Sequence, residues 1–171
     1  MNARSWRVIQ WALIVAVVAG LGIDAFVHFD LASTFRANRS SVLTEADLFR
    51  AEATAAVVAA LVLLVHPRRY TAALTFVVAA GGVGAVVLYR YVDVGAFGPV
   101  PDMYDPFWAP AEKNVSAIAE GVAALAALAL FWVLQPRARR SVGAVAETTG
   151  RRQPGFRRGR SGASVRRARR V

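Results

Sequence analysis

The main pattern along the chain is an alternation of four long apolar stretches with shorter polar segments. The apolar stretches cover residues 6–28, 46–65, 70–91 and 114–135. A bilayer core is crossed by about 20 mostly apolar residues in helical form. The second stretch is the weakest, because it reaches this length only if residues 48–52 enter the headgroup region. We therefore predict an all-α fold, a bundle of four transmembrane helices within residues 1–135.

Local signals mark the ends of these helices. Residues 44–47, Thr-Glu-Ala-Asp, resemble a capping box with Thr44 as N-cap. Pro67 disfavours helix at the residue before it, so residues 66–69 predict a tight turn between antiparallel neighbours. The first stretch also resembles a signal peptide, with two arginines before an apolar run. No clear A-x-A cleavage site follows it and the run is long, so we expect it to stay as a span.

The distribution of charge predicts the orientation in the membrane. Basic residues favour cytoplasmic loops. Arg4, Arg7, Arg68 and Arg69 lie on one side of a four-span chain, and that side carries no acid within residues 1–135. The opposite side carries five basic residues as well as the acids, so the bias is not complete. It favours a multi-pass protein of the cell membrane with both the N-terminus and the C-terminus in the cytoplasm.

Residues 136–171 differ from the rest of the chain. Although 56% of the chain is hydrophobic, its net charge is +10, and this last segment has twelve arginines and one acid. It lacks the apolar surface needed to fold, so we predict a disordered cytoplasmic tail. The tail could bind anionic lipid, bind nucleic acid through phosphates, or be a solvated tail that fixes topology. Without interleaved aromatic residues, nucleic acid is the least favoured partner.

Ionisable residues recur near the outer end of every predicted helix. In the first helix, Ala12, Ala16, Gly20, Asp24 and His28 share one face, where small residues allow close helix packing. Charged groups at this depth are costly in lipid, so we expect them to face the interior of the bundle. The expected polar cluster consists of Asp24, His28, Glu52, Arg90 and Glu120.

Three interpretations of this cluster remain open. Arg90 could neutralise one or two carboxylates in a salt-bridge network, with His28 hydrogen-bonded. The cluster could bind a divalent metal, since one imidazole with several carboxylates suits zinc, iron or manganese. The candidate metal ligands are His28, Asp24, Glu52 and Glu120. The third interpretation is a polar pocket or a proton relay open to the outside.

Several activities are disfavoured by the residues present. The chain has no cysteine, which excludes disulfides, thiol catalysis and iron–sulfur clusters. His28 and His66 are expected at opposite ends of the bundle, so they cannot share a haem iron. No phosphate-binding loop, H-E-x-x-H motif or Ser-His-Asp arrangement is recognised. We therefore assign no catalytic residue and favour a non-enzymatic role.

The segment between the last two helices is distinctive. Residues 94–113 contain four prolines and two glycines, which stiffen the chain into turns and extended pieces. Tyr104, Phe107 and Trp108 could anchor this segment at the membrane interface. The segment could equally form a lid over the polar cluster or a surface for a partner.

Short patterns across residues 5–135 resemble small four-helix membrane proteins of GC-rich bacteria. The patterns are His28-x-x-Leu31, Glu45-x-Asp47-Leu48-Phe49-Arg50, Tyr89-Arg90-Tyr91-Val92-Asp93, Gly98-Pro99-x-Pro101-Asp102-x-Tyr104-Asp105-Pro106 and Lys113-x-x-Ser116-x-x-x-Glu120. This resemblance implies a fold and a location and adds no activity.

The sequence as a whole favours a non-enzymatic accessory or envelope protein embedded in the bilayer. A membrane protein partner or a second copy of the chain would then complete a larger assembly. The alternative is a small transporter-like or metal-binding membrane protein that uses the polar cluster. The two hypotheses differ in whether the cluster needs a ligand.

Overall fold

The computed structural model describes residues 2–135, which form four α-helices and one short 3-10 turn. The elements are α1 (Ala3–Leu31), η1 (Thr34–Ala37), α2 (Glu45–Val65), α3 (Arg69–Tyr91) and α4 (Ala111–Val133). Each α-helix is long and apolar enough to cross a membrane, and no strand is present in this part of the chain. The prediction of an all-α fold with four such helices is confirmed. The predicted tail, residues 136–171, lies outside the described residues.

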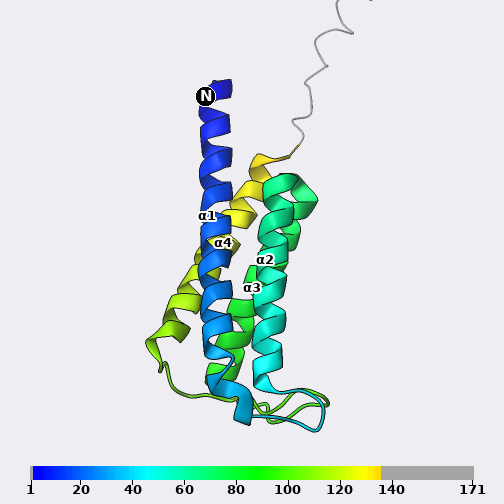
Figure 1. Cartoon of the computed structure of the whole chain (residues 1–171). Helices are drawn as coiled ribbons and strands as arrows, with labels where there is room; N and C mark the ends of the chain where they lie inside the picture. Colours follow the sequence, from blue (N-terminus) through cyan, green and yellow to red (C-terminus); the bar gives the residue numbers. More distant parts are fainter. Residues whose placement is uncertain (1, 136–171) are drawn as a thin grey trace, which may run out of the picture. The chain divides into compact units, whose positions relative to one another are not determined.

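The helices pack in a ring in which each contacts two neighbours. α1 packs against α2 and α4, and α3 packs against the same two helices. Successive helices run in opposite directions, so the start of α1, the α2–α3 turn and the end of α4 lie at one end of the bundle (Figure 1). The α1–α2 and α3–α4 connections lie at the other end, which we call the loop end (Figure 1).

The helix ends follow from local hydrogen bonds. The Thr44 side chain accepts a hydrogen bond from the Asp47 N–H at 3.1 Å, and the Thr44 N–H donates to Asp47 Oδ2 at 3.0 Å. This is the predicted capping box. α1 begins earlier than predicted because the Asn2 side chain caps it, accepting from the Ser5 N–H at 2.8 Å. α4 also begins earlier, directly after Pro110.

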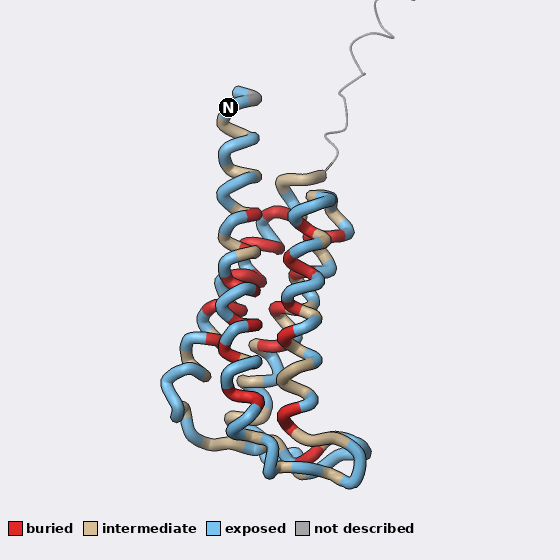
Figure 2. Tube along the Cα trace, viewed as in Figure 1, coloured by how far each residue is buried: buried red, intermediate tan, exposed pale blue. Residues whose placement is uncertain are grey.

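Side-chain size is distributed as expected for a bundle surrounded by lipid. Alanines such as Ala56 and Ala127 are fully buried between the helices, and buried positions line the interior in Figure 2. Large apolar side chains such as Phe26, Ile118 and Leu125 are about 70% exposed on the outside. Small residues permit close helix packing in a membrane, where burying large apolar side chains brings no gain over lipid contact.

The two connections at the loop end are joined by hydrogen bonds. The Ser40 hydroxyl donates to the Pro99 carbonyl at 2.6 Å, and the Asn38 amide donates to the Asp102 carbonyl at 2.6 Å. The Asp105 N–H donates to the Tyr89 carbonyl at 3.1 Å, which fixes the α3–α4 connection against the end of α3. The α3–α4 connection therefore lies across the loop end of the bundle (Figure 1).

Candidate functional site

A hydrogen-bonded group formed by α1 and α4 lies inside the bundle. Asp24 and His28 are one helical turn apart on α1, and the His28 Nδ1 atom lies 2.8 Å from Asp24 Oδ1 and 3.1 Å from the Asp24 carbonyl oxygen. Both oxygens are acceptors, so Nδ1 donates. The Ser116 hydroxyl of α4 donates to the same Oδ1 atom at 2.5 Å. Asp24 is completely buried, and these contacts satisfy only one of its two carboxylate oxygens.

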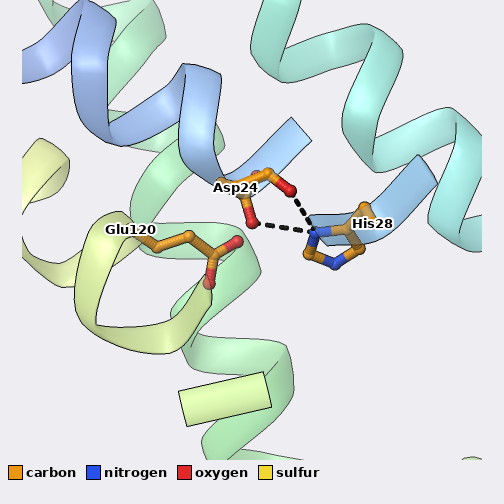
Figure 3. Close-up of side chains that lie close together, drawn as sticks. All are labelled: Asp24, His28 and Glu120. Atoms are coloured by element: carbon orange, nitrogen blue, oxygen red, sulfur yellow. Dashed lines mark hydrogen bonds and ion pairs between the residues drawn. The ribbon is translucent and has the colours of Figure 1, made fainter. Parts of the chain in front are cut away.

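Glu120 lies beside this group, close enough to Asp24 for the two carboxyl groups to share a hydrogen bond when one of them carries a proton. It is one turn after Ser116 on α4 and is 0% exposed. Neither of its carboxylate oxygens, nor Asp24 Oδ2, receives a hydrogen bond from the part of the protein described. One ligand atom each from Asp24, His28 and Glu120 lie within 4.8 Å of one another (Figure 3).

The other two helices complete the surroundings of Glu120 through Gly82 and Glu52. A Cβ atom placed on Gly82 of α3 would collide with Glu120 Oε1 and would lie 2.7 Å from Glu120 Cδ. The same Cβ position lies 3.1 Å from Glu52 Oε1 of α2. The carboxylates of Glu52 and Glu120 thus converge on a space that only a glycine leaves free. Glu52 Oε1 is also buried without a partner among the described residues.

All four helices meet at one level of the bundle. Asp24, Glu52, Gly82 and Glu120 each lie roughly two to two and a half turns, or about 10–14 Å, from the loop end of their own helix. We call Asp24, His28, Glu52 and Glu120 the acidic cluster. It contains three carboxylates and one imidazole, and Asp24 and Glu120 are completely buried.

Between the acidic cluster and the α3–α4 connection lies a cavity of about 110 Å³. A single water needs about 10–15 Å³, so the cavity has room for several waters or a small chemical group. His28 and Ser116 belong to its lining and connect it to the acidic cluster. Its remaining walls come from the α3–α4 connection and all four helices and include Phe49, Tyr89, Arg90, Met103, Phe107 and Trp108. We call it the loop-end cavity.

Two of the acidic groups that line this cavity have polar partners. Lys113 forms an ion pair with Asp105, and the Asn38 amide donates to Glu45 Oε2 at 2.7 Å. Partial burial alone would raise the pKa of Asp105, but hydrogen bonds from Lys113 and from the Phe107 N–H reverse this and lower the pKa below its ordinary value. Asp105 is therefore a charged partner of Lys113 at neutral pH.

Arg90 occupies a different position from the one expected from the sequence. It lines the loop-end cavity with His28, but it forms no ion pair with a carboxylate within residues 2–135. Its guanidinium lies over the rings of Trp108, at 5.3 Å, and Tyr91, at 5.4 Å. The interpretation of the cluster as a salt-bridge network around Arg90 therefore has no ion pair to support it among residues 2–135. Arg90 is the penultimate residue of α3, too close to the loop end to reach the level of Glu120.

The structure also adds residues that the sequence analysis did not include in the cluster. Ser116 precedes Glu120 by one turn of α4, and this four-residue spacing indicates that the two side chains share one face of the helix. Gly82 acts through the space it leaves, which becomes visible only once the helices are packed. Lys113 and Asp105 reach the loop-end cavity because of the path of the α3–α4 connection, which spacing along the chain does not predict.

Carboxylate oxygens and an imidazole nitrogen are donor atoms for divalent metals. Asp24 Oδ2 and both oxygens of Glu120 are free to accept among the described residues, and Glu52 Oε1 lies near Glu120. A mixed set of one nitrogen and several oxygens suits zinc, iron or manganese. A metal bound at Nδ1 of His28 would take the place of the proton that this atom now donates. In that arrangement Ser116 would hold the Asp24 carboxylate in position.

Comparison with known proteins adds no relative. No protein-family model, no curated protein and no solved structure matches the chain. The function is therefore argued from the geometry of the acidic cluster and the loop-end cavity.

Proposed function

We propose that this chain is a multi-pass membrane protein that binds a divalent transition-metal ion inside its helical bundle. Asp24, His28 and Glu120 are the proposed ligands, and Glu52 lies close enough to Glu120 to contribute an oxygen. The observation that carries the proposal is the state of Glu120, which is completely buried with neither carboxylate oxygen hydrogen-bonded by the described residues.

The energetic argument concerns charge. A buried carboxylate keeps its negative charge only when it is paired or hydrogen-bonded, and otherwise takes up a proton, because transfer of an unpaired charge from water to a low-dielectric interior is very unfavourable. The acidic cluster brings three carboxylates together without an arginine or lysine in contact with them among residues 2–135. A divalent cation would supply positive charge and accept the unused oxygen lone pairs.

The location of the metal follows from the proposed topology. Charge bias favours a cytoplasmic N-terminus and a cytoplasmic α2–α3 turn, which would place the loop end outside the cytoplasm. The loop-end cavity reaches His28 and Ser116, so metal would enter from that outer side. We favour a metal-binding accessory protein over an enzyme, because no nucleophile or catalytic motif was recognised in the sequence.

The test is metal binding by the purified full chain in detergent. Zn²⁺ and Mn²⁺ should raise the melting temperature, since a ligand at 100 times its Kd stabilises the folded state by about 2.7 kcal/mol. Mg²⁺ and Ca²⁺ should have a weaker effect, because they prefer all-oxygen sites. Metal content of the protein, measured after dialysis by mass spectrometry, gives an independent readout.

Matched variants distinguish metal binding at the proposed site from non-specific metal binding to acidic side chains. Glu120→Gln and Asp24→Asn should abolish the stabilisation by metal, whereas Glu112→Gln and Asp30→Asn should keep it. Glu112 lies on the same helix as Glu120, and Asp30 on the same helix as Asp24, but both are exposed. Equal stabilisation of all four variants would overturn the proposed site.

A further inference from the structure

Arg90, in the wall of the loop-end cavity, has no role in the proposed metal site. Arg90 Nε is buried and has no hydrogen-bond partner within the described residues. The guanidinium contacts aromatic rings on Trp108 and Tyr91 rather than a carboxylate. An arginine presents five N–H donors in a rigid fork, and the buried Nε–H of Arg90 leaves one of them without an acceptor among the described residues.

The other charged groups of the cavity do not supply the missing acceptor. Asp105 is near enough to Arg90 for the positive charge to act on it, but its ion pair is with Lys113, and Glu45 accepts from the Asn38 amide. His28 uses Nδ1 to contact Asp24. Arg90 is therefore the one guanidinium or ammonium group lining this cavity that forms no ion pair in the part of the chain described.

We propose that the loop-end cavity binds an oxyanion, a phosphate or carboxylate group, through Arg90. The planar fork of the guanidinium matches two oxygens of such a group. Phe107 and Trp108, which also line the cavity, offer apolar surface to the rest of the ligand. A volume of about 110 Å³ fits the charged group and a few carbon atoms, but not a large molecule.

An oxyanion can reach the loop end from two sources. Arg90 lies next to the last residue of α3, at the level where a spanning helix reaches the headgroups, so the oxyanion could belong to a lipid. A soluble small molecule entering beneath the α3–α4 connection would present the same group. The inference does not depend on metal in the acidic cluster, because Arg90 is not one of the proposed metal ligands.

The experiment compares the wild-type chain with Arg90→Gln, Arg90→Lys and Arg50→Gln. Arg50 also lies near the loop end, but it is half-exposed, pairs with Asp47 and does not line the cavity. Melting temperatures are measured without added metal in neutral detergent, with inorganic phosphate or acetate titrated against chloride at constant ionic strength. The same variants are then measured in phosphatidylcholine nanodiscs with and without phosphatidylglycerol.

Binding of a soluble oxyanion is expected to weaken about tenfold or more in Arg90→Gln, less in Arg90→Lys, and not at all in Arg50→Gln. If phosphatidylglycerol alone stabilises the wild type over Arg90→Gln, the oxyanion is a lipid phosphate. If Arg90→Gln does not fold, the comparison rests on Arg90→Lys, which keeps the positive charge but loses the planar fork. Weaker oxyanion binding by Arg90→Lys than by the wild type then supports the proposal. No difference between wild type and the Arg90 variants for any probe would overturn the proposal, whether or not metal binds.

Discussion

Gly82→Ala gives the sharpest test of the packing around the acidic cluster. The added methyl group would collide with Glu120 Oε1 and would lie 2.7 Å from Glu120 Cδ and 3.1 Å from Glu52 Oε1. Because backbone atoms are not among the nearest contacts, the carboxylate of Glu120 has to move. Glu120 is completely buried, so its carboxylate has no solvent to move into and must shift within the cluster.

The size of the effect follows from two opposing contributions. Alanine is more favourable than glycine inside a helix by about 0.5–1 kcal/mol. Adding a methyl group to a well-packed interior costs about 1–3 kcal/mol. Gly81→Ala and Gly84→Ala on the same helix meet no atom within 4 Å, so they show the first contribution alone. Gly82→Ala should therefore be about 1–3 kcal/mol less stable than either control.

The assay is reversible unfolding in mixed detergent micelles, followed by helical circular dichroism, with and without Zn²⁺. Gly82→Ala should unfold more easily than both controls, and it should lose most of the stabilisation by metal because Glu120 is displaced. The controls should match or exceed the wild type and keep the response to metal. If Gly82→Ala is as stable as Gly81→Ala and still responds to metal, Glu120 does not occupy the position described and the packing argument fails.

Two further predictions test topology and the loop-end ion pair. Reporter fusions within the α2–α3 turn at residue 67 and within the α3–α4 connection at residue 97 should report opposite sides of the membrane, with residue 67 cytoplasmic; the same side at both positions would contradict four spans. The lowered pKa of Asp105 means that its ion pair with Lys113 stabilises the fold above the ordinary Asp pKa of 3.8, and that this contribution is lost as the pH falls through the lowered value. Asp105→Asn should therefore melt below the wild type at pH 7 and approach it near pH 3, and a difference that does not depend on pH would refute this role for the ion pair.

The helices could be predicted because their signals are local. Apolar runs of spanning length, the capping box at Thr44 and the Pro67 turn each act within a few residues of the chain. The errors are at the ends, where α1 is extended by the Asn2 cap and α4 begins directly after Pro110. Such shifts are set by single hydrogen bonds and turns, which an apolar pattern does not resolve.

The acidic cluster could be predicted only in part. Four-residue spacing places Asp24 and His28 on one face of α1, and their contact at 2.8 Å follows from helix geometry. The approach of Glu120 to this pair depends on how far α4 is shifted along α1. That shift is fixed by close contacts such as Gly20, where an added Cβ would lie 2.7 Å from the Ala119 carbonyl oxygen. Contacts of this kind have no signature in a single sequence.

The position of Arg90 shows why charge alone was a poor guide. Placed at the same depth as Glu120, the guanidinium would be its natural counter-ion, and two opposite charges 4 Å apart gain about 4 kcal/mol at an effective dielectric constant of 20. Instead, Arg90 lies in the loop-end cavity under Trp108, whereas Glu120 lies in the acidic cluster about two turns deeper.

Because these charges are kept apart, Arg90 Nε in the wall of the loop-end cavity lacks an acceptor and carboxylate oxygens in the acidic cluster lack donors among the described residues. A bundle that only needed to neutralise them could do so through direct pairing, which would satisfy both groups at once. In the arrangement that we propose, each group has its own partner, a cation in the acidic cluster and an anion in the loop-end cavity, with His28 and Ser116 bordering both. Loss of the cation response in Glu120→Gln with the oxyanion response intact, and the reverse pattern in Arg90→Gln, would establish two independent sites.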